Sequence, residues 1–137
     1  MKNVFADACY WIATVNPGDS LSVMAQNAHQ KLGPVLLVTT DEALTEFLTS
    51  LSNQGPHLRE KAVKMVRQIM RHSNIRVIAQ SRGSFLAGVH LYSQRNDKAY
   101  SLPDCVAMNT IRAEGIQEVL TNDHHFEQEG ITILMKP

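Results

Sequence analysis

The sequence has 137 residues, of which 44% are hydrophobic and 19% charged, and its 13 basic side chains balance its 13 acidic ones. This composition fits one compact domain over residues 1–137, with its own hydrophobic core and no disordered tail. A net charge of zero excludes a general attraction to nucleic acid, so any such contact has to come from a local patch.

The sequence contains neither a recognisable targeting signal nor a disulfide motif. No apolar run approaches the roughly 20 residues of a membrane span, and Met1 and Lys2 lead into strand-like sequence rather than a signal peptide. Cys9 and Cys105 are far apart and form no C-x-x-C motif. We therefore expect a cytoplasmic protein without membrane contact, whose two cysteines are reduced, small buried residues.

Strands alternate with helices along the chain. Apolar periodicity and Gly/Pro breakers predict strands over 2–7, 35–38, 75–79, 118–123 and 131–134, and helices over 9–15, 21–32, 41–52, 57–72, 84–94 and 103–113. This alternation is typical of a central parallel sheet covered by helices on both faces, which is a three-layer α/β/α fold.

Three of the predicted helices carry more specific signals. Asp19 or Ser20 should cap the helix over 21–32. Ser101 should cap the helix over 103–113, where Asp104 completes a Ser-x-x-Asp pattern. The helix over 57–72 should bury one apolar stripe, made of Leu58, Ala62, Met65, Val66, Ile69 and Met70.

Four acids are predicted to meet at one edge of the sheet. Asp7 ends the first strand and Asp123 ends the fourth, so both lie at the carboxyl edge, where open α/β sheets bind ligands. Asp104 starts a helix that returns to the same edge, and Glu46 lies in the first half of the helix after the second strand. Asp41 and Glu42 are better explained as favourable charges in a first helical turn.

A cluster of four carboxylates predicts bound cations. Adjacent anionic groups repel each other and disfavour joint ionisation. Oxygen-only ligation is what Mg²⁺ or Mn²⁺ prefers, and two such ions about 4 Å apart can clamp a phosphodiester displacement. The pattern therefore favours a metal-dependent nuclease that cleaves phosphodiester bonds.

Five stretches of the sequence resemble one known family. They are VFAD, Trp11-Ile12-Ala13, TTDEALTEFL, NDKAYSLPDC and TNDHHFEQEGITIL, which cover nearly the whole chain in order. Together they are similar to PIN domains, and specifically to VapC-type toxin ribonucleases. Each stretch alone is a weak signal, whereas their order and the spacing of their acids are specific.

The resemblance implies a function and a set of site residues. It implies a PIN fold, RNA cleavage with Mg²⁺ or Mn²⁺, homodimerisation, and inhibition by a VapB-type antitoxin of a type II module. The motif acids of the family fall on Asp7, Glu46, Asp104 and Asp123, which are thus both metal ligands and catalytic residues. Many relatives have Ser or Thr after the first acid, where this chain has Ala8-Cys9. Ser101 and Asn122 then remain as candidates to bind water or phosphate.

Several patterns leave two readings open. Lys61, Lys64 and Arg67, followed by Arg71, form a basic stripe at helical spacing, which is either a solvated helix face or a surface that steers RNA phosphates. His124-His125 is interpreted as a solvated helix start rather than a phosphate contact.

Two other functions compete with the nuclease. One is a PIN-like domain that binds RNA or protein and has lost catalysis. The other is a receiver-like signalling domain, which would need two adjacent acids after an early strand. This chain offers only Asp7 there.

Overall fold

Five parallel strands form the centre of the computed structural model, which describes all residues from 1 to 137. The sheet has the order β3-β2-β1-β4-β5, and every neighbouring pair is parallel. The strands are β1 (Lys2–Ala6), β2 (Val35–Thr40), β3 (Ile75–Ile78), β4 (Glu118–Leu120) and β5 (Thr132–Ile133). A receiver domain has the order 2-1-3-4-5, so the receiver-like alternative is wrong.

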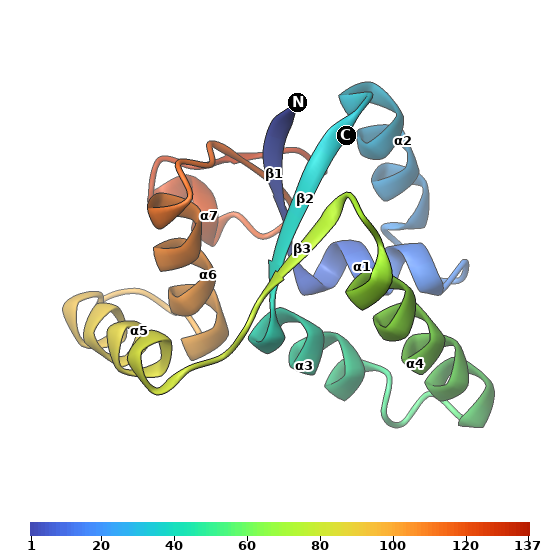
Figure 1. The fold of residues 1–137 in the computed structure, drawn as a ribbon, viewed down its shortest axis with the longest axis horizontal. Helices are drawn as coiled ribbons and strands as arrows, with labels where there is room; N and C mark the ends of the chain where they lie inside the picture. Colours follow the sequence, from blue (N-terminus) through green and yellow to red (C-terminus); the bar gives the residue numbers. More distant parts are fainter.

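Helices cover both faces of this sheet, as the sequence predicts. They are α1 (Ala8–Val15), α2 (Ser22–Leu32), α3 (Asp41–Ser50), α4 (Pro56–Arg71), α5 (Arg82–Gln94), α6 (Leu102–Ala113) and α7 (His125–Gln128). In Figure 1, α1, α2 and α4 lie on one side of the sheet, α5, α6 and α7 lie on the other, and α3 lies beneath the strands. The α/β fold class is therefore confirmed.

The central strand β1 is buried on both of its faces. Val4 and Ala6 belong to the core that the sheet forms with α1 to α4, whereas Phe5 belongs to the core on the side of α5 to α7. All three residues are 0% exposed. A strand covered on both faces has to be apolar at every position rather than at alternate ones, which explains the run Val-Phe-Ala.

The strand order creates a switch point between β1 and β4. The chain leaves β1 toward β2 on one side and reaches β4 on the other, and the register places Phe5 beside both Val38 and Val119. Crevices at such points, at the carboxyl ends of the strands, are where open α/β sheets bind ligands. Asp7 follows β1 directly, and Thr121 follows β4.

Three local predictions differ from the structure. Helix α2 has Leu21 at its N-cap, because Asp19 instead accepts a hydrogen bond from the Leu21 N–H at 3.0 Å in the preceding turn. Met70 is 58% exposed, because about 100° of rotation per residue carries it past the edge of the stripe that buries Ala62 and Ile69. For the short helix α7, the sequence predicts only a helix start at His124-His125 and no bounds.

All the helices are too short or too polar to span a bilayer.

Candidate functional site

One pocket collects the four predicted acids at the switch point. Its volume is about 420 Å³, and Asp7, Glu46, Asp104 and Asp123 all line it. The rest of the lining is Ala8, Cys9, Ile12, Leu21, Ser50 and Asn122. Neither lysine nor arginine lines this pocket, so its walls supply no permanent positive charge to offset the carboxylates.

Asp7 is fixed at the end of β1 by the neighbouring strand. Its N–H donates to the Leu120 carbonyl at 3.2 Å, and the Thr121 hydroxyl donates to its Oδ2 at 2.9 Å. The residue is only 7% exposed. Burial, assisted by the charges of Asp104 and Asp123, raises the pKa of Asp7 from 3.8 to about 6, although hydrogen bonds to its carboxylate from the Ala8 backbone and the Thr121 hydroxyl oppose the shift. Asp7 is therefore a rigid and poorly solvated anion.

Asp104 is held by the predicted cap of α6. The Ser101 hydroxyl accepts from the Asp104 N–H at 3.2 Å, and Asp104 Oδ2 accepts from the Ser101 N–H at 3.0 Å. This reciprocal capping box confirms the cap predicted from the sequence. Burial raises the pKa of Asp104, and the charge of Asp123 adds to the shift against the Ser101 hydrogen bonds.

Glu46 reaches the pocket from the middle of α3. It is half-buried, and burial raises its pKa from 4.5 to about 7, with further contributions from Asp7, Asp104 and Asp123. The three aspartates that raise this pKa come from three other elements of the fold. A carboxyl with this pKa is only partly ionised at neutral pH unless a cation approaches it.

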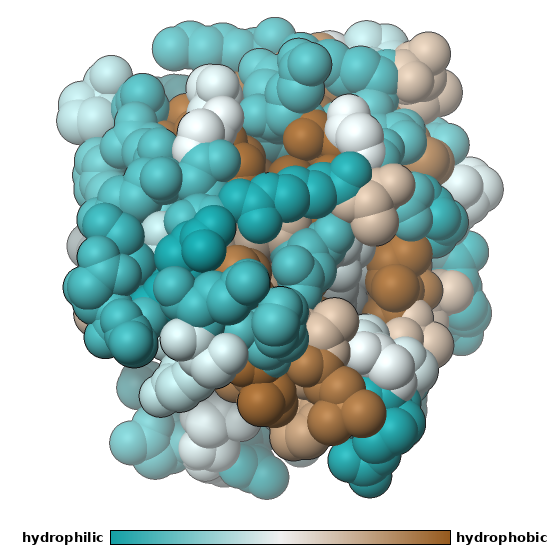
Figure 2. Space-filling model, turned by 90° about the vertical axis from the view of Figure 1, so that its left-hand side faces the viewer, coloured by the Kyte–Doolittle hydropathy of each residue, from teal (hydrophilic) through white to brown (hydrophobic).

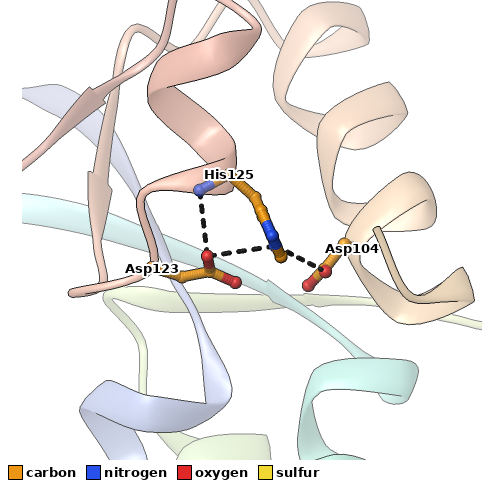
Figure 3. A group of neighbouring side chains, drawn as sticks. All are labelled: Asp104, Asp123 and His125. Carbon is orange, nitrogen blue, oxygen red and sulfur yellow. Dashed lines mark hydrogen bonds and ion pairs between the residues drawn. The ribbon is translucent and has the colours of Figure 1, made fainter. Parts of the chain in front are cut away.

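His125 joins two of these acids and contradicts the interpretation of His124-His125 as a solvated helix start. Its ring Nδ1 lies 3.2 Å from Asp123 Oδ1 and 3.6 Å from Asp104 Oδ2, and its backbone N–H donates to Asp123 Oδ1 at 2.9 Å (Figure 3). His124 is solvated as expected, with a side chain 72% exposed. Adjacent helical residues point about 100° apart, so one ring faces solvent and the next faces the acids.

These donors fit a divalent cation. One ligand atom from each of Asp104, Asp123 and His125 lies within 4.8 Å of the others. The Nδ1 atom of His125 is buried and has no aligned hydrogen-bond partner. An orphaned nitrogen beside carboxylates of raised pKa is what a bound cation would relieve, because it supplies both the missing partner and the missing positive charge.

Of the residues predicted to bind the substrate, some lie at the acidic pocket and others do not. Asn122 lines the pocket, with its Nδ2 donating to the Met135 carbonyl at 2.9 Å, and the Ser101 hydroxyl is used as an acceptor in the cap. Lys61 and Lys64 instead line a separate hollow of about 280 Å³ beside the end of α1. Arg67 is exposed on the same helix.

Cys9 lies two residues after Asp7 and lines the same pocket. Its Sγ lies 3.2 Å from Thr121 Oγ1 and accepts from the Asn122 N–H at 3.4 Å. Burial, followed by the charge of Asp7, raises the pKa of the Cys9 thiol to about 11. The thiol thus stays protonated and acts as a packing contact. Both cysteines are free, as predicted, and Cys105 is fully buried.

Solved structures of toxins share this fold. The crystal structure of Mycobacterium tuberculosis VapC20, a sarcin–ricin loop cleaving toxin, matches with a TM-score of 0.84 and 23% identity, over 94% of this chain and 96% of that one. A toxin–antitoxin complex from Klebsiella pneumoniae matches with a TM-score of 0.59 and 17% identity, over 88% of this chain and 87% of that one. FitAcB from Neisseria gonorrhoeae matches with a TM-score of 0.62 and 11% identity, over 96% of both chains.

Sequence comparison alone finds no relative. No protein-family model and no curated protein matches the chain. At identities of 11 to 23% the structural matches establish the fold. The chain has the PIN-domain fold of VapC-type toxins, which confirms the resemblance seen in its sequence.

Proposed function

We propose that this protein is a metal-dependent endoribonuclease and the toxin of a type II toxin–antitoxin module. The observation that carries the proposal is the pocket in which four carboxylates meet without a lysine or arginine. Such a cluster costs free energy unless cations occupy it. The PIN-domain fold, shared with a toxin described as cleaving the sarcin–ricin loop, supports RNA as the substrate.

In this proposal Asp7, Glu46, Asp104 and Asp123 hold one or two Mg²⁺ or Mn²⁺ ions. The ions would supply Lewis acidity and water activation for phosphodiester hydrolysis. The protein contributes rigid ligands, since the Thr121 hydroxyl fixes Asp7 and the capping box fixes Asp104. The hydroxyl proton of Ser101 is free to orient water or a phosphate oxygen, because the cap uses this hydroxyl only as an acceptor. The Nδ2 of Asn122 already donates to the Met135 carbonyl and Met24 Sδ, so its Oδ1 can orient a water but not a phosphate oxygen. The cleaved strand would carry a 5′-phosphate.

The proposed partners follow from the same assignment. A similar fold was crystallised in a toxin–antitoxin complex, so we expect a VapB-type antitoxin to bind and inhibit this chain in the cytoplasm.

Leu86, Val89 and Tyr92 recur every three residues on α5 and are 55%, 41% and 56% exposed. Figure 2 views the side that carries α5 and shows apolar surface near the lower edge of the molecule. This surface is available for the expected homodimer.

The test is cleavage of a sarcin–ricin loop oligonucleotide by the purified protein in MnCl₂, MgCl₂ or EDTA. We expect cleavage with either metal and none in EDTA. Asp104→Asn removes a charged ligand at nearly constant size, and it should lower the rate by about a thousandfold or more, because metal charge stabilisation is worth several kcal/mol. A mock purification from cells without the gene excludes contaminating nuclease.

Asp97→Asn is the matched control. Asp97 is also an acid, but its side chain is 72% exposed and pairs only with Lys98, so this variant should cleave at the parent rate. If Asp104→Asn cut as fast as Asp97→Asn, the catalytic assignment would be wrong. If the parent protein bound the oligonucleotide without cutting this RNA or total cellular RNA, the alternative of an inactive PIN-like binding domain would replace the nuclease.

A further inference from the structure

The side chain of His125 presents one nitrogen to the acidic pocket without a hydrogen-bond partner. Nδ1 is buried, and its contact with Asp123 Oδ1, at 3.2 Å, is not aligned as a hydrogen bond. Its other near neighbour is Asp104 Oδ2, at 3.6 Å. Both neighbours are carboxylate oxygens, and ionised carboxylates only accept hydrogen bonds. The nitrogen is thus placed among acids but is poorly aimed at either of them.

The spacing of these atoms matches ligands of a single ion. Oxygen and nitrogen ligands lie roughly 2.0 to 2.2 Å from small divalent metals, so adjacent ligands around one ion are about 3 Å apart. The distances of 3.2 Å and 3.6 Å from Nδ1 to the two carboxylates fall near this value. One donor atom from each of the three residues can therefore reach the same ion with small side-chain adjustments.

The ring of His125 packs against Tyr100, which belongs to a partly buried hydrogen-bond network. The Tyr100 and His125 ring centroids are 5.4 Å apart, with an angle of 60° between the planes. The Tyr100 hydroxyl donates to Glu129 Oε2 at 2.8 Å, and Arg95 donates to the same carboxylate. The backbone N–H of His125 donates to Asp123 Oδ1 and so fixes the main chain of the histidine beside that acid. The contact with Tyr100 and this backbone bond together limit the positions open to the ring.

We propose that His125 Nδ1 is a direct ligand of the divalent ion, beside Asp104 and Asp123, and that this nitrogen makes the site select Mn²⁺ over Mg²⁺. Imidazole nitrogen suits the transition metals, whereas Mg²⁺ prefers oxygen ligands throughout. The inference deepens the proposed function, because it rests on the metal site of the nuclease and adds one residue and a metal preference to it. The acids alone would favour neither ion strongly.

The decisive measurement is electron spin echo envelope modulation of the full chain loaded with MnCl₂. A directly ligating imidazole produces nitrogen modulation on the Mn²⁺ signal, which changes when the protein contains ¹⁵N-labelled histidine. We expect this modulation in the parent protein and in His124→Ala, and its loss in His125→Ala. Absence of histidine nitrogen coupling in the parent Mn²⁺ complex overturns the proposal without any need for a variant.

Calorimetric titration with MnCl₂ and with MgCl₂ tests the selectivity. His125→Ala should weaken Mn²⁺ binding by about tenfold or more while changing Mg²⁺ binding less than about threefold. His124→Ala is the matched control, since its ring pairs with Glu127 at 2.6 Å, and it should change neither affinity. An unaltered Mn²⁺ to Mg²⁺ preference in a folded His125→Ala protein overturns the proposal.

Asp104→Asn separates this inference from the function on which it rests. If the parent protein binds metal and Asp104→Asn weakens both ions, but His125→Ala affects them equally or not at all, the acidic site stands and the role of His125 is wrong. If the parent protein binds neither ion, or Asp104→Asn changes nothing, the metal site itself is wrong and both proposals fall.

Discussion

Glu129 and Asp7 are both buried carboxylates, yet they meet opposite surroundings. The side chain of Glu129 is 5% exposed and accepts from Arg95 at 3.0 Å, from Tyr100 at 2.8 Å and from Arg112. These donors lower its pKa to about 2. Asp7 is 7% exposed and shares its pocket with three other acids, and its pKa rises to about 6.

This difference separates a carboxylate that the protein neutralises itself from a group of carboxylates that it leaves without a basic partner. The fold supplies two arginines and a tyrosine to one acid, and so satisfies it completely. It assembles the other acids with hydrogen-bond donors such as Thr121 but without a lysine or arginine lining their pocket. Placing carboxylates together without a basic side chain destabilises the metal-free protein. Such an arrangement is expected at a site that binds a cation, because an arginine within the site would compete with the ion.

The largest effect of a single substitution on the free energy of unfolding is expected at Glu129, whose charge the protein neutralises with two arginines. Glu129→Gln keeps the shape but removes the charge that two arginines and Tyr100 share, so it should lower the free energy of unfolding by about 3 kcal/mol. Urea unfolding in EDTA measures this loss. Glu127→Gln is the control, since Glu127 is 37% exposed and pairs with His124 and Lys136, and its loss should be much smaller than that of Glu129→Gln because surface ion pairs contribute little. Equal losses in the two variants would contradict the comparison.

The second prediction is that the acidic pocket makes the metal-free protein less stable as the pH rises. Asp7 has a pKa of about 6 in the folded protein and 3.8 as its ordinary value, and Glu46 has about 7 against 4.5. Between about pH 4 and pH 8 the folded state therefore binds more protons than the unfolded state, and its free energy of unfolding falls with rising pH. For Asp7 alone the fall approaches about 3 kcal/mol.

Glu129 has the opposite dependence, because its pKa is lowered from 4.5 to about 2. Its stabilisation is complete above about pH 4.5 and disappears as the pH falls toward 2. Melting curves in EDTA should thus show a maximum near pH 4, where the rising contribution of Glu129 and the falling contributions of Asp7 and Glu46 balance. Asp7→Asn should flatten the decline above that maximum, and saturating MnCl₂ should reverse it, since the ion binds the deprotonated acids. A metal-free protein whose stability rises from pH 5 to pH 8 would refute this account.

Sequence reasoning located the acids because strand ends and helix starts are local features. Asp7 and Asp123 directly follow strands, and the capping pattern of Ser101 with Asp104 fixes the start of α6. The partners of Glu129 carry no local signal, since Arg112, Tyr100 and Arg95 lie 17, 29 and 34 residues away in the sequence. Their meeting depends on how α5, α6 and α7 pack, which periodicity does not specify.

His125 was missed for a related reason. The sequence shows two adjacent histidines after Asp123, and only the direction in which α7 turns decides which ring faces the acids. A helix start was expected there, but its rotation about its own axis was not predictable from four residues. The position of His125, two residues after a predicted metal ligand, was the one signal available.

The smallest effect is expected from the basic stripe, which concerns RNA binding and leaves stability unchanged. Helix α1 runs from Ala8 at the acidic pocket to Val15 at the hollow lined by Lys61 and Lys64. A rise of 1.5 Å per residue makes that distance about 10 Å, close to one screening length at physiological ionic strength. One RNA strand can therefore contact both places.

Replacing Lys61, Lys64 and Arg67 together by Ala should weaken RNA binding and flatten its dependence on salt. Each phosphate contact to a single strand contributes about 0.7 to the slope of log K against log salt concentration, so losing three contacts should reduce the slope by up to about 2. Fluorescence anisotropy in the Asp104→Asn background measures binding without cleavage. The control variant replaces Lys31, Arg82 and Lys98 together by Ala, since these residues line neither the acidic pocket nor the hollow beside α1. If both triple variants keep the parent slope, the stripe is a solvated helix face, and the acids alone, through their cations, bring the RNA phosphate to the pocket.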